Sequence, residues 1–205
     1  GGKLGIGVTA PQSKLQVAGG IQMADDSATA AATKVGTMRY RTGTEYVEVT
    51  GIELVTNGDF ENGSTGWGGN QTAPATVTFS SGKVTIVSPS GESAYRNQSI
   101  LVPTKTYKGT VDVVVRSGSC KLQWGTGTGA GTSAMSATGS YVFYKTIPAT
   151  GADAQFYIAR NGACDVDIDN VSVMEVTSED ASYADMCMQT GSSTYEWVNI
   201  VRNTY

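Results

Sequence analysis

Three aspartates alternate near the end of the long central segment of the chain. Asp165, Asp167 and Asp169 are separated by Val166 and Ile168, so in a strand the carboxylates share one face and the aliphatic side chains take the other. Paired carboxylates carry out glycoside hydrolysis, but those pairs lie roughly 5 to 9 Å apart across a sugar and usually come from different strands. A row on one strand therefore favours a solvated strand edge, and we predict no enzyme.

The other reactive side chains are few. The chain contains no histidine, and its three cysteines, Cys120, Cys164 and Cys187, lack a Cys-x-x-Cys spacing. Because histidine is the usual general base and zinc sites need spaced Cys or His, neither kind of site is expected. Cys120 and Cys164 could meet across strands, but free thiols are favoured, since a core of this size needs no disulfide.

Charge and hydropathy exclude two classes of partner. The formal net charge is −4, and the 14 Lys and Arg residues are spread along the chain. Nucleic acids and anionic membranes need a clustered basic patch, so neither is expected. No apolar run reaches the roughly 20 residues that span a bilayer. The chain begins with Gly1 and Gly2 rather than Met, so we expect further sequence before it.

The elements that must position these side chains are strands. Gly accounts for 26 of the 205 residues, and Thr, Ser and Val recur, which is typical of short strands and turns. Within residues 52–176, alternating apolar and polar residues predict strands at 77–79, 83–88, 95–102, 107–116, 120–125, 140–147, 154–160 and 166–176. So many strands form two packed sheets, because one sheet would leave an apolar face in water. We predict a jelly roll with Trp67 and Tyr107 in its core and a long loop at 125–139.

The flanking segments, 1–51 and 177–205, read as one thinner β-structure that the jelly roll interrupts. Residues 1–24 contain short apolar pairs such as Leu4 with Ile6, broken by Gly and Pro. Strands this short are marginal in water, so copies in other chains must complete them. Residues 36–51 show a hairpin pattern, and 180–201 is predicted to pair with it around the insertion point.

These flanks resemble phage tail fibres. The matching residues are the LGIG and KL-x-V-x-GG run at 4–20, GTMRYR at 36–41 and MCMQTGSSTYEWVNI at 186–200. The resemblance implies a homotrimer in the virion that acts at the host cell surface and joins other virion tail proteins through the missing N-terminal part. The first motif also occurs in surface adhesins, so a bacterial adhesin of the same build stays open.

Residues 52–176 resemble jelly-roll carbohydrate-binding modules. The resemblance rests on ELVTNGDFE and GW within 53–67, on QSI and TYKGTVDVVVR, and on IDNVSV at 168–173. It implies a structural calcium ion held by the side chains of Glu61 and Asp169 and a backbone oxygen of Asp59, which suits a cation that prefers clustered oxygens. The alternative is that Asp59 makes turn hydrogen bonds and Asp169 marks a bulge.

A sugar would need aromatic rings for its C–H faces and polar groups for its hydroxyls. Taking the apolar residues of each strand as core, the outer face of one sheet would carry Asp112, Arg116, Gln123, Gln155 and Tyr157. Trp124 and Tyr95, near strand ends, form an alternative platform. An ordinary hydrated sheet face explains the first set equally well.

The sequence therefore predicts an all-β chain that attaches a virion tail fibre to a bacterial surface glycan without chemistry on the ligand. Three shallow sites in a homotrimer would reinforce one another by multivalency. The alternative is a structural spacer or trimer-stabilising knob with no glycan site.

Overall fold

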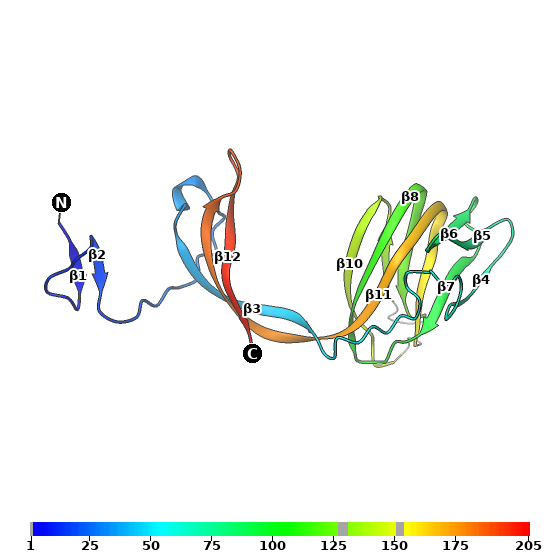
Figure 1. Ribbon diagram of the computed structural model, residues 1–205, viewed down its shortest axis with the longest axis horizontal. Helices are drawn as coiled ribbons and strands as arrows, with labels where there is room; N and C mark the ends of the chain where they lie inside the picture. Colours follow the sequence, from blue (N-terminus) through cyan, green and yellow to red (C-terminus); the bar gives the residue numbers. More distant parts are fainter. Residues whose placement is uncertain (1, 127–130, 151–153) are drawn as a thin grey trace. The chain divides into compact units, whose positions relative to one another are not determined.

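The computed structural model describes residues 2–126, 131–150 and 154–205 and consists largely of β-strands (Figure 1). Two compact units divide the chain: Tyr46–Thr177 form the inserted unit, and Gly1–Glu45 with Ser178–Tyr205 form the flanking unit. The sequence-based boundaries at 52 and 176 lie close to these divisions. In the part of the chain that the structure describes, no helix is long and apolar enough to cross a membrane.

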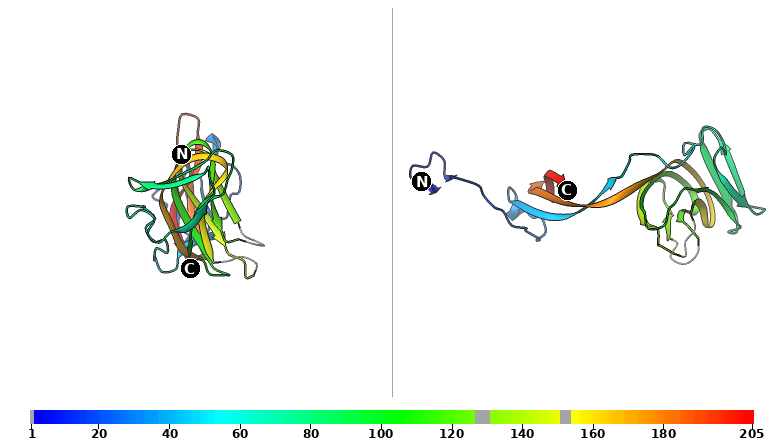
Figure 2. Two further views of the ribbon diagram at one scale, coloured as in Figure 1. Left: turned by 90° about the vertical axis from the view of Figure 1, so that its right-hand side faces the viewer. Right: turned by 90° about the horizontal axis from the view of Figure 1, so that it is seen from below.

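The inserted unit is a sandwich of two antiparallel layers that share their two longest strands. One layer has the strand order β10-β8-β11-β6-β5, and the other has the order β9-β8-β11-β7-β4. Figure 2 shows these strands curving around a common interior. The strands are β4 (Gly68–Gln71), β5 (Thr76–Ser80), β6 (Lys83–Ser88), β7 (Ala94–Ser99), β8 (Thr106–Trp124), β9 (Gly131–Met135), β10 (Gly139–Thr146) and β11 (Gln155–Gln189).

A bend in β8 and β11 carries both strands from one layer into the other. The pairing register of the two strands shifts between Arg160 and Cys164. Opposite this point Gly118 has a φ of 67°, and a Cβ there would lie 2.0 Å from the backbone oxygen of Ala163, so glycine is required. The sequence prediction of separate strands at 107–116 and 120–125 was wrong, because the glycine bends a continuous strand.

The core lies between the layers and confirms the predicted jelly-roll class. The side chains of Val113, Leu122, Phe156 and Ile168 come from both halves of the shared strands and are buried together. Trp67 and Tyr107 are buried as predicted. The indole nitrogen of Trp67 donates a hydrogen bond to the backbone oxygen of Asn57 at 3.0 Å, which satisfies the polar group of this buried ring.

Three local predictions are corrected. The predicted loop at 125–139 contains β9, and its residues 127–130 lie outside the described residues. The strand β4, Gly-Gly-Asn-Gln, was missed because it has no apolar alternation. The predicted hairpin within 36–51 is one strand, β3 (Met38–Glu48), in which Gly43 lies against the ring of Tyr183 rather than in a turn.

The flanking unit contains the remaining strands. Its β1 (Leu4–Ile6) and β2 (Leu15–Val17) pair in parallel, and a short 3-10 turn, η1, spans Ala32–Lys34. Both β3 and β12 (Tyr195–Thr204) pair with β11, so the predicted pairing of the two flanks is confirmed. At the centre of this sheet the buried carboxylate of Asp185 accepts hydrogen bonds from Arg39, Arg41 and Asn199.

Candidate functional site

A solvent-open depression of about 270 Å³ lies on the outer surface of the β9-β8-β11-β7-β4 layer. Strand pairing explains its position. Ala159 on β11 lies opposite Tyr95 on β7 and opposite Lys121 on β8. The small methyl group of Ala159 leaves space between two long side chains, so this position forms the floor of the depression. The other lining residues are Ser93, Ala94, Gln123, Thr126, Tyr157 and Arg160.

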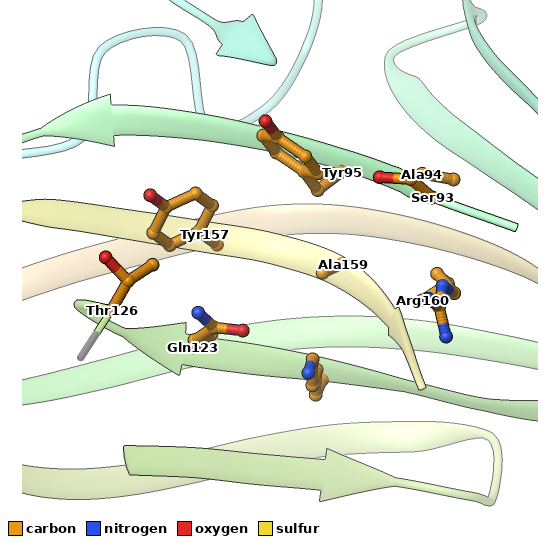
Figure 3. A pocket seen from close by; sticks show the side chains of 9 residues that line it. Ser93, Ala94, Tyr95, Gln123, Thr126, Tyr157, Ala159 and Arg160 are labelled. Atoms are coloured by element: carbon orange, nitrogen blue, oxygen red, sulfur yellow. The ribbon is translucent and has the colours of Figure 1, made fainter. Parts of the chain in front are cut away.

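The alternation of β11 decides which side chains reach this surface. Phe156 and Ile158 point into the core, so Tyr157 and Ala159 point outward. The ring centroids of Tyr157 and Tyr95 lie 5.5 Å apart with the rings at 69°. This edge-to-face pair presents apolar ring surface beside polar groups, as Figure 3 shows. Gln123 donates through its side-chain nitrogen to the backbone oxygen of Gly125 at 3.0 Å, which orients its amide.

The structure brings together only part of the predicted sugar-binding set. Tyr95, Gln123 and Tyr157 line the depression. Gln155 does not line it; its side-chain oxygen accepts a hydrogen bond from Asn97 at 2.5 Å. Trp124 is 0% exposed, so its assignment as a binding platform was wrong.

The burial of Trp124 follows from the bend in β8. A Cβ built on Gly109 would lie 2.5 Å from the Trp124 ring, so these two residues of one strand face each other across the core. Position 109 accommodates the large indole because glycine has no side chain.

The bend also separates Asp112 and Arg116 from the depression. Both belong to the part of β8 that pairs with β10 and with 164–176 of β11. Asp112 lines a second depression of about 300 Å³. The expectation of one outer face holding all five residues was wrong, because residues before and after Gly118 lie in different layers.

The carboxylate of Asp112 is held by hydrogen bonds from two neighbouring strands. It accepts hydrogen bonds from Ser140 at 2.5 Å and from the side chain of Asn170 at 2.8 Å. The bond from Ser140, followed by that from Asn170, lowers the pKa of Asp112 below its ordinary value. This carboxylate links β8, β10 and β11.

Two of the alternating aspartates, Asp165 and Asp167, form an ion-paired cluster rather than the predicted solvated edge. Arg116 donates to Asp165 at 2.8 Å and to Asp167 at 2.9 Å, and Asp167 also accepts from Lys83 and Thr85. Chiefly through the bond from Arg116, the pKa of Asp167 is held far below its ordinary value. A general acid needs the opposite shift, so Asp167 is unsuited to that role.

The two cations that line the depression were not part of the predicted sugar-binding set. Lys121 alternates with Gln123 on β8, so their shared outward direction was visible in the sequence. Arg160 directly follows Ala159, so alternation would send it to the opposite face; it lines the depression at the point where the pairing register of β11 shifts, which no local pattern shows.

Two of the three predicted calcium ligands, Glu61 and Asp59, lie close to the same turn. A Cβ on Gly82, in the turn between β5 and β6, would lie 2.4 Å from Glu61 Oε1 and 3.5 Å from the Asp59 backbone oxygen. These two oxygens therefore lie near one turn. Asp169 directly follows Ile168, which pairs with Val84 just beyond that turn.

Other contacts match the alternative interpretation of these residues. Asp59 Oδ1 accepts a bond from the Glu61 backbone at 3.3 Å, and Asp169 Oδ1 accepts one from the Asn170 backbone at 2.6 Å. Within the described ranges, no three His, Cys, Asp or Glu residues are grouped to hold a metal. A calcium ion here would need backbone oxygens as well.

The opening segment of the inserted unit is joined to β11 by a residue that the sequence did not single out. Glu53 Oε1 accepts hydrogen bonds from the backbone nitrogens of Val55 at 2.8 Å and Val173 at 2.9 Å.

Comparisons with known proteins give likenesses among solved structures only. No protein-family model matches the chain, and no curated protein matches it. The enzymatically active domain of tailspike protein 4 from bacteriophage CBA120 is 15% identical with a TM-score of 0.45, over 60% of this chain and 21% of that one. The CBM22-1 and GH10 modules of Clostridium thermocellum xylanase 10B are 17% identical with a TM-score of 0.45, over 60% and 28%. A family 16 carbohydrate-binding module is 18% identical with a TM-score of 0.44, over 58% and 98%.

Proposed function

We propose that the inserted unit binds carbohydrate through the depression on β7, β8 and β11 and leaves the ligand chemically unchanged. The observation that carries this proposal is the convergence of Tyr95, Tyr157 and the oriented amide of Gln123 in one solvent-open depression. Aromatic rings suit the C–H faces of a sugar, and an amide suits its hydroxyls. Ligand pockets begin at about 300 Å³, so this depression suits a terminal sugar or a short segment bound weakly.

The proposal of binding without catalysis is supported by the placement of the carboxylates. None of the described residues that line the depression is acidic. The alternating aspartates lie on the part of β11 that belongs to the other layer. Asp167 is moreover held by Arg116, Lys83 and Thr85, so it has no proton to give at neutral pH.

We further propose that the chain belongs to a virion tail fibre, acts as a homotrimer at the host cell surface, and joins other tail proteins. Exposed apolar side chains support self-association: Leu4, Ile6 and Leu15 on the short strands, and Met188 and Val201 on the flanking sheet. Covering such surfaces with copies of the chain removes apolar area from water. Three weak sites would then act together on a glycan surface.

Calcium is part of the same proposal. Glu61 and Asp169 would supply carboxylate oxygens and Asp59 a backbone oxygen, near the turn that contains Gly82. The ion would stabilise the fold by joining the opening turn to the last strand of the unit.

The test is binding of the purified chain, in calcium, to an array of bacterial surface glycans. We expect a Tyr157→Ala variant to lose binding about tenfold, equivalent to about 1.4 kcal/mol. Tyr144→Ala is the matched control, because Tyr144 is an exposed tyrosine of the same unit that stacks on Tyr46 and does not line the depression. If binding is unchanged in Tyr157→Ala, the glycan binds at another surface of the protein.

If no glycan on a broad array binds, the alternative function, a structural spacer, is favoured. The mass in solution, measured by light scattering, tests the trimer separately. A monomeric mass would refute the fibre proposal without bearing on the glycan site.

A further inference from the structure

We propose that the depression selects glycans that carry a negative charge, such as those with a sugar carboxylate. This inference rests on the proposed glycan-binding function and names the class of ligand. It comes from the distribution of charge around the depression, which differs from that of the chain as a whole.

The depression is positively charged in an acidic protein. Two of its lining residues, Lys121 and Arg160, are cationic, and no described lining residue is acidic. The whole chain carries a formal net charge of −4. An anionic ligand would therefore be repelled by much of the surface and attracted at this position.

The two cations differ from most other cations of the inserted unit. Lys83, Lys105, Lys108 and Arg116 each form a salt bridge with an Asp or Glu. Among the residues that the structure describes, Lys121 and Arg160 form none. Because ammonium and guanidinium groups only donate hydrogen bonds, an acceptor with negative charge is the ligand group that suits them best.

The aromatic and cationic groups are spaced for a single sugar. Figure 3 shows Tyr157, Gln123 and Thr126 toward one end of the depression and Arg160 at the other, with Ala159 between. Tyr157 and Ala159 are two residues apart on one strand, a rise of about 7 Å. A ring resting on the tyrosines would direct a substituent acid group over Ala159, toward Lys121 and Arg160.

The test uses matched pairs of glycans that differ only in charge. The purified chain is titrated with trigalacturonic acid and its methyl ester, with sialyllactose and lactose, and with phosphomannan and mannan. We expect at least one charged member to bind about tenfold more tightly than its neutral partner at low salt. The advantage should shrink in 0.5 M salt, where the Debye length falls to about 4 Å. Carboxylate and phosphate are distinguished by which pair shows the difference.

Variants locate the effect. Lys121→Met and Arg160→Met should each weaken binding of the charged glycan about fivefold more than binding of its neutral partner, within the range expected for one exposed ionic contact. Lys145→Met is the matched control, because it removes the same charge from a described cation that does not line the depression. If Lys145→Met weakens binding of the charged glycan as much as Lys121→Met or Arg160→Met does, the inference is overturned.

The failure of this inference differs from failure of the proposed function. Charge selection is refuted if neutral and charged glycans bind equally, or if array hits are mainly neutral. Glycan binding at the depression stands in either case, provided that Tyr157→Ala still weakens it. If neither the pairs nor the array shows binding, both fail.

Discussion

Replacing Asp167 by Asn should destabilise the inserted unit by about 2 kcal/mol. The Asp167 side chain is 8% exposed and accepts hydrogen bonds from Lys83 at 2.6 Å, Thr85 at 2.7 Å and Arg116 at 2.9 Å. Asn keeps the shape but removes the charge and turns one acceptor into a donor. A hydrogen bond to a charged group contributes about 1.5 to 3 kcal/mol. Because the Lys83 and Arg116 side chains are 40% and 41% exposed, water can solvate them, so we expect the loss of about one such bond.

Asp165→Asn is the matched control for burial. Asp165 lies on the same strand and binds the same Arg116, but its side chain is 36% exposed. Exposed ion pairs contribute about 0.2 to 1 kcal/mol. The control should therefore lose no more than about 0.5 kcal/mol.

Urea unfolding followed by tryptophan fluorescence measures both variants. In a Trp197→Phe background the remaining two of the three tryptophans, Trp67 and Trp124, are buried in the inserted unit. With a slope of about 2 kcal/mol/M, Asp167→Asn should lower the midpoint by about 1 M at an unchanged slope. Equal midpoints for the Asp167 and Asp165 variants would refute the reasoning.

The same pair of proteins tests the pH dependence. Arg116 first, and then Lys83 and Thr85, lower the pKa of Asp167 in the folded state against the opposing effect of burial. A lowered folded pKa adds stability above the unfolded value of about 3.9, and this contribution is lost as pH falls toward the folded value. The difference between the parent and Asp167→Asn should be constant from about pH 6 to 8 and narrow below about pH 4. A difference that grows on acidification would contradict this.

Three further predictions concern the thiols, the opening turn and calcium. Burial raises the pKa of Cys120 to about 12, so a thiol reagent at pH 8 should leave Cys120 unlabelled in the folded protein and label it after unfolding; labelling of the folded state would contradict its burial. Gly58→Ala should cost about 1 to 3 kcal/mol by urea unfolding, because its Cβ would lie 1.9 Å from the backbone oxygen of Val171; Gly20→Ala, where nothing lies within 4 Å, is the control. Adding a chelator should lower the melting temperature if the proposed calcium ion is bound, whereas an unchanged melting temperature would refute the calcium proposal.

Local sequence pattern determined much of the fold. A strand sends successive side chains to opposite faces, so alternation assigned Val166 and Ile168 correctly to the buried face. Trp67 and Tyr107 were also correctly assigned to the core. The size of the predicted core favoured free rather than bonded cysteines, and the structure has three free, buried thiols. The pairing of the two flanks was predictable because an insertion at an exposed turn leaves the host strands intact.

The candidate site was decided by tertiary structure. Alternation shows which residues of one strand share a face, but a bend at a glycine changes the layer to which that face belongs. Gly118 therefore separates Arg116 from Gln123 and brings Trp124 against Gly109 inside the core. Register between distant strands then places Tyr95 and Lys121 on either side of Ala159, and this arrangement depends on contacts that no local pattern contains.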